Sequence, residues 1–376
     1  MGFAEFATPY RWERIAPMKR TASAHPDGMI DLSVGSPVDP TPDAVRRALA
    51  SASDAPNAHG YPVTVGTGVL RAAISGWFSR WHGFSLESIG AGFVPSVGSK
   101  EAVALMASLL GLGPGDVVVQ PAVSYPTYEI GTQLAGASTL KVDVTDVASW
   151  VSHPGVKLVW VNSPCNPTGE ILPAETMRRI VEAARSIGAV VVSDECYALM
   201  DWRGDDDSVA PSVLSPSVSG GSLESVLCLY SLSKQSNMAG YRTAFIAGDP
   251  DIITPMIEQR KQIGLIIPGP VQAAMAAGLD DDQAVVVQKA RYRRRLNALV
   301  EGLRAAGYDA AMPDGALYVW TRAKSGDCWK DMEWLAGLGI IASPGEFYGD
   351  PTSLRFSSTA TDAAVDGAVA RLHAAA

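Results

Sequence analysis

Short apolar runs alternate with helical patterns through the middle of this chain, and this alternation limits its fold more than any other feature. Residues 156–161 have the pattern of a buried strand, 162–170 form a loop rich in Pro and Gly, and 173–187 have helical spacing. The run 189–193 is then the next strand. This order is typical of right-handed βαβ units around a mostly parallel sheet. We therefore expect an α/β fold.

The 376 residues exceed the size at which one hydrophobic core usually keeps growing, so more than one domain is expected. Past residue 280 a basic helix and two strands predict a smaller α+β unit, at 288–306, 316–320 and 353–356. We expect an N-terminal segment that joins this unit, a large domain and a C-terminal small domain, at 1–40, 41–279 and 280–376. Residues 203–225, which contain three Asp and a Ser/Pro/Gly tract, are expected to form an exposed loop on the large domain.

Charge and composition exclude several classes of protein. A net charge of −9 argues against nucleic acid or an anionic membrane as the main partner, although local arginines can still bind a small anion. No run approaches the roughly 20 apolar residues that cross a bilayer, and the N-terminus lacks a secretory apolar run. The scattered cysteines and histidines predict neither a disulfide framework nor a metal site. We expect a cytoplasmic protein with reduced cysteines.

The segment Ser231-Leu-Ser-Lys234, followed by Arg242, lies between two apolar runs at 226–230 and 243–248. A lysine at the mouth of a buried strand is desolvated, which lowers its pKa and frees its amine to attack a carbonyl carbon. The alternative is a surface lysine in a turn, where most lysines lie. These residues alone leave both interpretations open.

Three polar residues follow the strands expected at 156–161 and 189–193. Asp194 directly follows 189–193, at the strand end where open α/β sheets bind ligands. A buried aspartate needs a cationic partner, and a protonated heterocycle nitrogen would serve; a helix N-cap is the common alternative. Asn166 and Tyr197 can hydrogen-bond a ligand in the same crevice, but turn chemistry and core packing also explain them.

Two elements offer donors to an anion. The amides of Ser99 and Lys100 open a predicted helix, whose dipole favours a negative charge. Ser231 and Arg242 add a hydroxyl and a guanidinium from the lysine loop. A plain capped helix also explains the first pair, but both sets flank one candidate lysine and together favour phosphate binding.

In their order along the chain, these motifs resemble the class I/II pyridoxal-phosphate aminotransferases of fold type I, and the resemblance covers nearly the whole chain. The motifs are Gly98-Ser-Lys, Tyr125-Pro, Asn166-Pro-Thr-Gly, Asp194-x-x-Tyr197, Ser231-x-Ser-Lys234, Arg242 and Leu354-Arg355. The resemblance implies that the large domain binds pyridoxal 5′-phosphate.

The resemblance also implies a role for each residue around the cofactor ring. Lys234 would form the Schiff base and move the proton between Cα and C4′. Asp194 would keep the pyridine nitrogen protonated, Asn166 and Tyr197 would hydrogen-bond the ring hydroxyl, and Tyr125 would stack on the ring.

Further implied roles concern the phosphate and the subunit contact. Ser99 and Lys100, through backbone amides, and the side chains of Ser231 and Arg242 would bind the phosphate. Tyr61 matches the tyrosine that is usually lent to the partner subunit's phosphate, which implies a homodimer with shared active sites.

The substrates implied are small amino acids and 2-oxo acids. Arg355 would hold the substrate α-carboxylate in a bidentate pair, with contacts from Gly35 and Asn166. The distal end of a substrate needs further donors, and the cations considered for it are Lys19, Arg260, Lys261 and Lys324. Residues 316–318 and 345–347 are expected to border this part of the pocket.

Four longer stretches resemble the actinobacterial succinyldiaminopimelate aminotransferases of lysine biosynthesis, namely 31–42, 193–197, 231–242 and 342–349. That resemblance implies exchange of the amine of N-succinyl-LL-2,6-diaminopimelate with 2-oxoglutarate. Ala342-Ser343 and Ser357-Ser358 depart from the expected pattern and can alter the substrate pocket. An aspartate- or alanine-type aminotransferase, a C–S β-lyase and a non-catalytic binding domain are the alternatives.

Overall fold

The core of the protein is a seven-stranded sheet in which one strand runs opposite to the other six. The computed structural model describes residues 6–7, 11–205 and 207–375. In spatial order the strands are β2 (Gly92–Val97), β8 (Thr243–Gly248), β7 (Val226–Ser231), β6 (Val190–Asp194), β5 (Val156–Asn162), β3 (Val117–Pro121) and β4 (Ser138–Val142). β8 pairs antiparallel with both β2 and β7, and the other pairs are parallel. The expected α/β fold with a mostly parallel sheet is confirmed.

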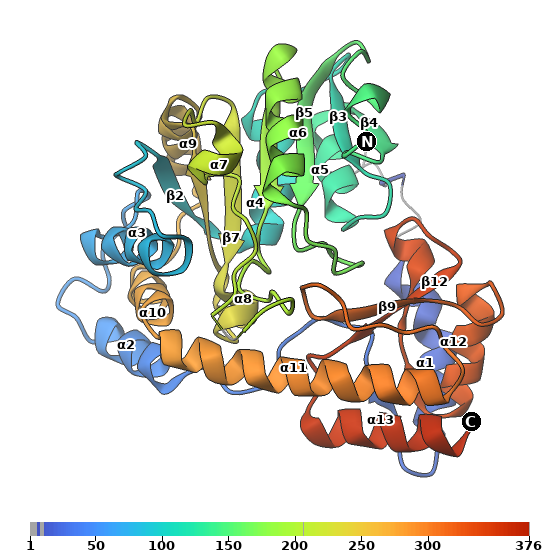
Figure 1. Ribbon diagram of the computed structural model, residues 1–376. Coiled ribbons are helices and arrows are strands. Elements are labelled where there is room, and N and C mark those ends of the chain that lie inside the picture. The colour runs from blue at the N-terminus through green and yellow to red at the C-terminus, as the bar shows by residue number, and fades with distance from the viewer. Residues whose placement is uncertain (1–5, 8–10, 206, 376) are drawn as a thin grey trace, which may run out of the picture.

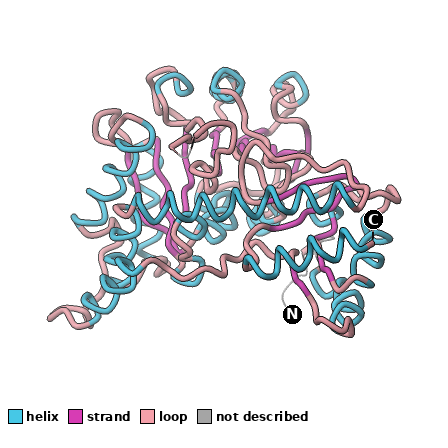
Figure 2. Tube along the Cα trace, turned by 60° about the horizontal axis from the view of Figure 1, so that its bottom comes forward, coloured by secondary structure: helices cyan, strands magenta, loops and turns pink. Residues whose placement is uncertain are grey.

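Helices cover both faces of this sheet (Figures 1 and 2). Leu227 and Leu229 of β7 belong to the apolar layer under α4 (Ser99–Leu109) and α9 (Pro250–Gln262). The alternate residues Cys228 and Tyr230 face the opposite layer, which includes α3 (Gly68–His82) and α6 (Ala174–Ser186). Because both faces are buried, the strands read as continuous apolar runs rather than as alternating patterns. The remaining helices of this part are α2 (Asp43–Ser53), α5 (Thr127–Ala135), α7 (Pro216–Ser219), α8 (Leu232–Gln235) and α10 (Gly269–Leu279).

A smaller set of elements lies beside the large sheet. It contains the antiparallel sheet β11 (Ser343–Pro344), β12 (Ser353–Ser357) and β9 (Tyr318–Arg322), and the helices α12 (Cys328–Gly337) and α13 (Asp362–Ala374). The N-terminal helix α1 (Ala16–Ser23) contacts α12, and β1 (Ile30–Asp31) pairs with β10 (Ile340–Ile341). The early residues therefore pack with the last hundred, while the expected limits at 40 and 279 stay a prediction.

The longest helix, α11 (Asp282–Ala305), runs past both sets of elements (Figures 1 and 2). It begins six residues before the helix expected at 288–306, because the Asp281 side chain accepts a hydrogen bond from Ala284 N and caps it. The strand expected at 316–320 begins two residues later than expected, at Tyr318. The reason is that Ala316 has a left-handed φ of 59°, which a strand does not accommodate.

The expectation of an exposed loop at 203–225 is wrong for its middle part. Residues 203–205 are exposed, but Ala210, Val213, Leu214 and Val218 are buried in the main core, and α7 lies within the segment. Serine is the commonest residue of this segment, whereas the apolar side chains between the serines determine its packing.

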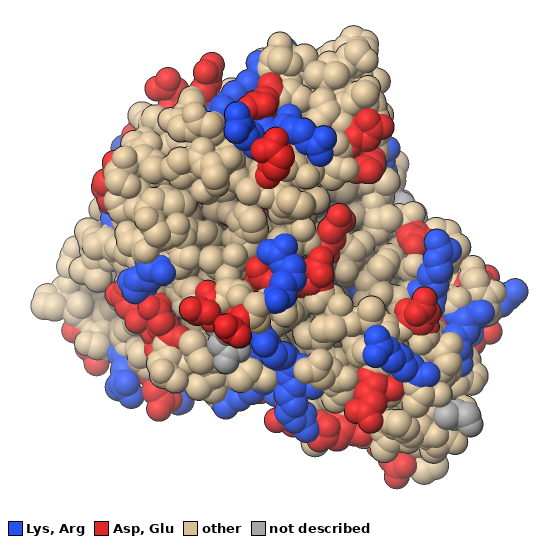
Figure 3. All heavy atoms as spheres, viewed as in Figure 1, with Lys and Arg blue, Asp and Glu red and all other residues tan. Residues whose placement is uncertain are grey.

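Surface and cysteine features complete the fold. Basic and acidic side chains are interspersed on the face shown in Figure 3. Within the described ranges, no helix combines the length and apolar character needed to span a bilayer. The four cysteines are buried and free.

Candidate active site

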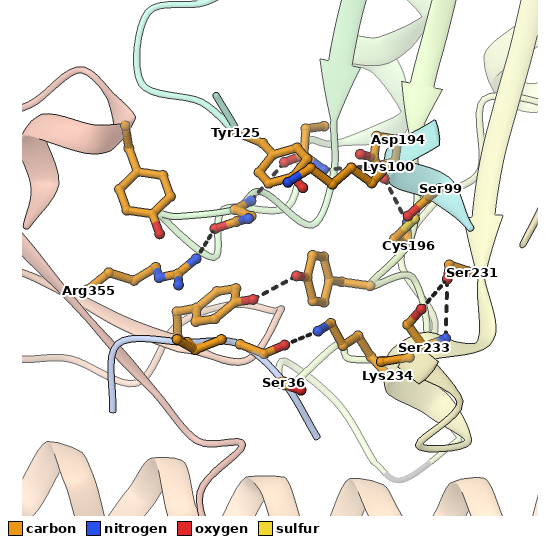
Figure 4. Close-up of a pocket in the computed structure, with 18 of the residues that line it drawn as sticks. Ser36, Ser99, Lys100, Tyr125, Asp194, Cys196, Ser231, Ser233, Lys234 and Arg355 are labelled. Carbon is orange, nitrogen blue, oxygen red and sulfur yellow. Dashed lines mark hydrogen bonds between the residues drawn. The ribbon is translucent and has the colours of Figure 1, made fainter. Parts of the chain in front are cut away.

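One cavity of about 270 Å³ lies where the carboxyl ends of the central strands meet the N-terminal segment and the small sheet. All of the site residues expected from the sequence line it except Tyr61 (Figure 4). Those residues are Gly35, Ser99, Lys100, Tyr125, Asn166, Asp194, Tyr197, Ser231, Lys234, Arg242 and Arg355. The fold thus brings together side chains that lie more than 300 residues apart, and their chemical roles stay predictions.

Lys234 lies in the single turn of α8, directly after β7. Its Nζ donates a hydrogen bond to the carbonyl oxygen of Gly35, which comes from the N-terminal segment. Burial lowers the pKa of Lys234, and the nearby charges of Arg355 and Arg242 lower it further. A larger fraction of neutral amine is therefore available for attack on a carbonyl carbon.

Asp194 ends β6 and is 6% exposed. Its carboxylate accepts hydrogen bonds from Tyr128 Oη at 2.9 Å and from Cys196 N at 3.2 Å. Burial raises the pKa of Asp194 in spite of these bonds. Among the described residues, no Lys, Arg or His makes an ion pair with it, so a bound cation would stabilise its charged form.

Asn162, at the end of β5, joins the two loops on either side of this carboxylate. Its Nδ2 donates to the carbonyl oxygen of Asp194 at 2.9 Å, and its Oδ1 accepts from Asn166 N at 2.8 Å. Asn162 is 5% exposed and lines the cavity. It therefore fixes where Asn166 and Asp194 lie relative to each other.

The residues expected to bind a phosphate, here called the anion cradle, all line the cavity: Ser99, Lys100, Ser231 and Arg242. Ser99 and Lys100 begin α4, and Gly98 before them has a φ of 80°, which favours glycine. A Cβ at Gly98 would overlap the Arg242 guanidinium, so the close approach also requires glycine. Ser231 Oγ accepts from Ser233 N at 3.2 Å, and both serine hydroxyls line the cavity.

Arg355 projects from β12 toward the large sheet (Figure 4). It donates to Asn166 Oδ1 at 2.7 Å and to the Ser33 carbonyl oxygen at 2.8 Å. The guanidinium lies 3.9 Å from the ring centroid of Tyr318 and 4.7 Å from that of Tyr348. A planar cation held in this way can bind a carboxylate by two parallel hydrogen bonds.

Two tyrosines connect Arg355 with Lys234. Tyr197 Oη and Tyr318 Oη share a hydrogen bond of 2.8 Å. Burial acts to raise the pKa of Tyr318, but the charges of Arg355 and Lys234 and the bond from Tyr197 outweigh it, so the pKa is lowered. A Cβ at Gly35 would overlap the Tyr318 hydroxyl, which explains the glycine there.

Several lining or supporting residues were not expected from the sequence. Tyr128 lies in the first turn of α5, three residues after Tyr125, and this closeness in sequence is the one signal that could have pointed to it. Trp12 and Tyr348 carry no local signal, because only the packing of the small sheet brings them to the cavity. Of the residues expected to border the pocket, Tyr318 lines the cavity. Residues 345–347 do not line it, and the next residue, Tyr348, does.

The structure does not support the four cations that were considered for binding the distal end of a substrate, because none of them lines this cavity. Arg260 is fully buried against Glu101 at 2.8 Å. Lys19 pairs with Asp31 at 2.8 Å, and Lys324 lies 3.7 Å from the Trp334 ring centroid. Lys261 is exposed on α9. Arg260, Lys19 and Lys324 therefore interact with other groups of this chain outside the cavity.

Tyr61 lies outside the cavity and is fully exposed. It borders a second, larger depression between α2 and α10, together with Val63, Val69 and Ala273. Its expected contact with a partner subunit stays a prediction.

The donor set fits a phosphorylated pyridine aldehyde. The buried carboxylate of Asp194 calls for a cation such as a protonated ring nitrogen, and the cradle at Ser99 and Arg242 calls for an anion. Lys234 and Tyr125 line the same cavity as these groups. These are the groups that pyridoxal 5′-phosphate requires, as the sequence resemblance implied.

Comparisons with known proteins agree with this site. A family model described as aminotransferase class I and II matches residues 27–372. The chain is 42% identical to the 4-dedimethylamino-4-oxo-anhydrotetracycline transaminase OxyQ of Streptomyces rimosus, over 96% of this chain and 98% of that protein. It is 31% identical to an LL-diaminopimelate aminotransferase of Gloeobacter violaceus, over 98% and 96% of the two chains. A probable N-succinyldiaminopimelate aminotransferase from Thermus thermophilus superposes with a TM-score of 0.85 at 25% identity, over 97% of this chain and all of that one.

Proposed function

Because this chain belongs to the class I and II aminotransferases, which depend on pyridoxal 5′-phosphate, we propose that it aminates 2-oxoglutarate with N-succinyl-LL-2,6-diaminopimelate. The products would be N-succinyl-2-amino-6-oxopimelate and glutamate, as in lysine and diaminopimelate biosynthesis. The names of two similar proteins, the G. violaceus and T. thermophilus enzymes, support a diaminopimelate-type substrate.

The observation that carries the proposal is the placement of Arg355 in the same cavity as the Lys234 amine. A substrate α-carboxylate on this guanidinium would form a bidentate pair. The pair would fix the rotation of the substrate about its Cα, so that one Cα–H bond faces the lysine. Such alignment favours proton removal at Cα.

When bound, pyridoxal 5′-phosphate supplies an aldehyde carbon that accepts the amine and a ring that withdraws electrons from Cα. Lys234 would take the proton from Cα with its Nζ, helped by the lowered pKa of that amine. The Asp194 carboxylate would hold a proton on the ring nitrogen. The Tyr197 and Tyr318 hydroxyls would orient polar groups beside Lys234.

The identity to OxyQ supports a second candidate. A transaminase acting on a 4-oxo-anhydrotetracycline ring, as that relative is named, would use the same cofactor residues. The two candidates differ in the amino acceptor, which is an open-chain 2-oxo acid in one and a polycyclic ketone in the other.

We also propose a homodimer that works in the cytoplasm. Tyr61 is fully exposed on the face between α2 and α10, where a second subunit could receive it. The four free, buried cysteines are consistent with a reducing compartment.

An absorbance experiment tests the reaction. The loaded protein should be yellow and should lose this colour with glutamate and, in a parallel cuvette, with N-succinyl-LL-2,6-diaminopimelate. Loss with glutamate alone would keep the transaminase and discard this substrate. Release of ammonia and pyruvate from cystathionine would instead indicate a β-lyase.

A lysine variant tests the assignment of the base. Lys234→Ala should bind the cofactor non-covalently and show no colour change with glutamate. Lys261→Ala, which alters an exposed lysine outside the cavity, is the matched control and should behave as wild type. Normal turnover by Lys234→Ala would show that another group is the base.

A further inference from the structure

The cavity has two chemically different sides. The side formed by the large sheet carries the groups assigned to the cofactor, including Ser99, Asp194 and Arg242. The other side is lined by Trp12, Val34, Tyr318 and Tyr348 around the guanidinium of Arg355. If Arg355 binds the α-carboxylate, the substrate side chain must lie along a surface that is mainly aromatic and aliphatic.

Trp12 is held firmly at this surface although it opens a helix of only four residues, Trp12–Ile15. Its ring packs edge-on against Phe347, with centroids 5.4 Å apart. Two residues later, Arg14 pairs with Glu346 and lies 4.3 Å from the ring centroid of Trp329. Trp329 in turn donates its indole N–H to Glu346.

The neighbouring Ile15 is 2% exposed and anchors the same turn in the core. Trp12 itself is half-buried and lines the cavity. An indole fixed in this way loses little freedom when a ligand packs on it, which favours binding. A flat surface of this kind best matches a flat group on the ligand.

We propose that Trp12 selects the amino substrate by stacking its indole on a planar part of the substrate side chain, such as an acyl amide or an aromatic ring. This inference rests on the proposed aminotransferase function and on Arg355 as the α-carboxylate site. The alanine side chain has no planar group, and the planar carboxylate of glutamate is charged and strongly hydrated, so neither donor would gain much from stacking on an apolar indole. Trp12 is then a specificity residue, whereas Arg14 and Glu346 position it.

The experiment compares Trp12→Ala and Trp12→Phe with the wild-type holoenzyme on four amino donors: N-succinyl-LL-2,6-diaminopimelate, phenylalanine, glutamate and alanine. For planar donors, Trp12→Ala should raise KM by about tenfold or more with little change in kcat, as for loss of a buried aromatic contact. KM for glutamate and alanine should change by less than about threefold. Trp12→Phe should restore most of the difference, since it keeps a flat ring.

Two further measurements separate selection from a structural effect. Trp334→Ala removes an indole of α12 that does not line the cavity, so the ratio between planar and short donors should not change. In a Lys234→Ala background, where turnover is blocked, calorimetry should show the same loss of affinity for the planar donor on adding Trp12→Ala.

Some outcomes would overturn the inference. Equal losses for all four donors would make Trp12 a structural residue, and so would a ratio that changes equally in Trp334→Ala. If the wild-type enzyme converts glutamate but no planar donor, then Trp12 does not select planar substrates and the inference is refuted. Failure of the wild type with every donor would instead refute the proposed function.

Discussion

Replacing Tyr128 by phenylalanine should weaken catalysis without touching any atom that lines the cavity. Tyr128 is fully buried, and its hydroxyl donates to Asp194 Oδ2 at 2.9 Å. Its ring stacks on Trp160 with centroids 4.7 Å apart, and phenylalanine keeps that packing. The substitution therefore removes one hydrogen bond and little else.

The size of the effect follows from the character of that bond. A hydrogen bond to a charged group contributes about 1.5–3 kcal/mol, and Asp194 would retain the backbone N–H and the thiol of Cys196 as described donors. Converted to a rate, this is a loss of about 10-fold to 150-fold. The loss falls on the charged form of Asp194, which is the form that would hold the ring proton.

The pH dependence has a definite sign. Burial already raises the pKa of Asp194, and the Tyr128 hydroxyl opposes that rise. Without the hydroxyl the pKa rises further, so less carboxylate is ionised at a given acidic pH. The acid limb of the rate profile should therefore move to higher pH.

Stopped-flow absorbance of the glutamate half-reaction, repeated across a pH series, measures both effects. Tyr230→Phe is the matched control, because its buried hydroxyl donates to Gln235 at 2.6 Å and not to Asp194. A wild-type rate and pH profile for Tyr128→Phe would refute the reasoning. The same shift in Tyr230→Phe would show a general effect of losing a buried hydroxyl.

Three other substitutions test the cradle, the carboxylate site and the fold. Gly98→Ala should displace the Arg242 guanidinium and raise the cofactor dissociation constant about tenfold or more in an equilibrium titration; unchanged affinity would contradict the cradle. Arg355→Lys should keep the yellow colour and raise KM for glutamate by about 10-fold to 100-fold in initial-rate assays, and a normal KM would remove Arg355 from substrate binding. Asp39→Asn breaks a 2.7 Å pair with Arg295, in which the side chains are 12% and 2% exposed, and should cost about 3 kcal/mol of unfolding free energy in urea. Burial acts to raise the pKa of Asp39, but the bonds from Arg295 and Gln288 outweigh it and lower the pKa below the ordinary 3.8. The difference in unfolding free energy between wild type and Asp39→Asn should therefore persist at neutral pH and fade as pH falls below that value. A difference that stays undiminished in acid would contradict this reasoning.

The elements that could be predicted from the sequence are those whose signal is local. β5, β6 and β7 are apolar along their whole length because both faces of each strand are buried, and their limits were expected within a residue or two. Asp194 and Lys234 could be placed for the same reason, since Asp194 ends such a strand and Lys234 follows one within a turn.

The features that could not be predicted depend on contacts between distant residues. The bond between Tyr128 and Asp194 spans 66 positions, and that between Arg355 and Asn166 spans 189. The failure of Arg260 as a substrate-binding residue has the same origin, because its partner Glu101 lies 159 positions away. Charge type is visible in a sequence, whereas the partner that neutralises it is not.

The two sides of the cavity are encoded in different stretches of the gene. The anion cradle, Asp194 and Lys234 come from the middle of the chain, whereas Trp12, Gly35 and Arg355 come from its two ends. On the proposed roles, mutation near either end of the chain should change which substrate is accepted and leave the residues assigned to the cofactor unchanged. A library that keeps Gly35 and randomises other lining positions of these end segments would therefore explore new substrates while the cofactor residues stay the same.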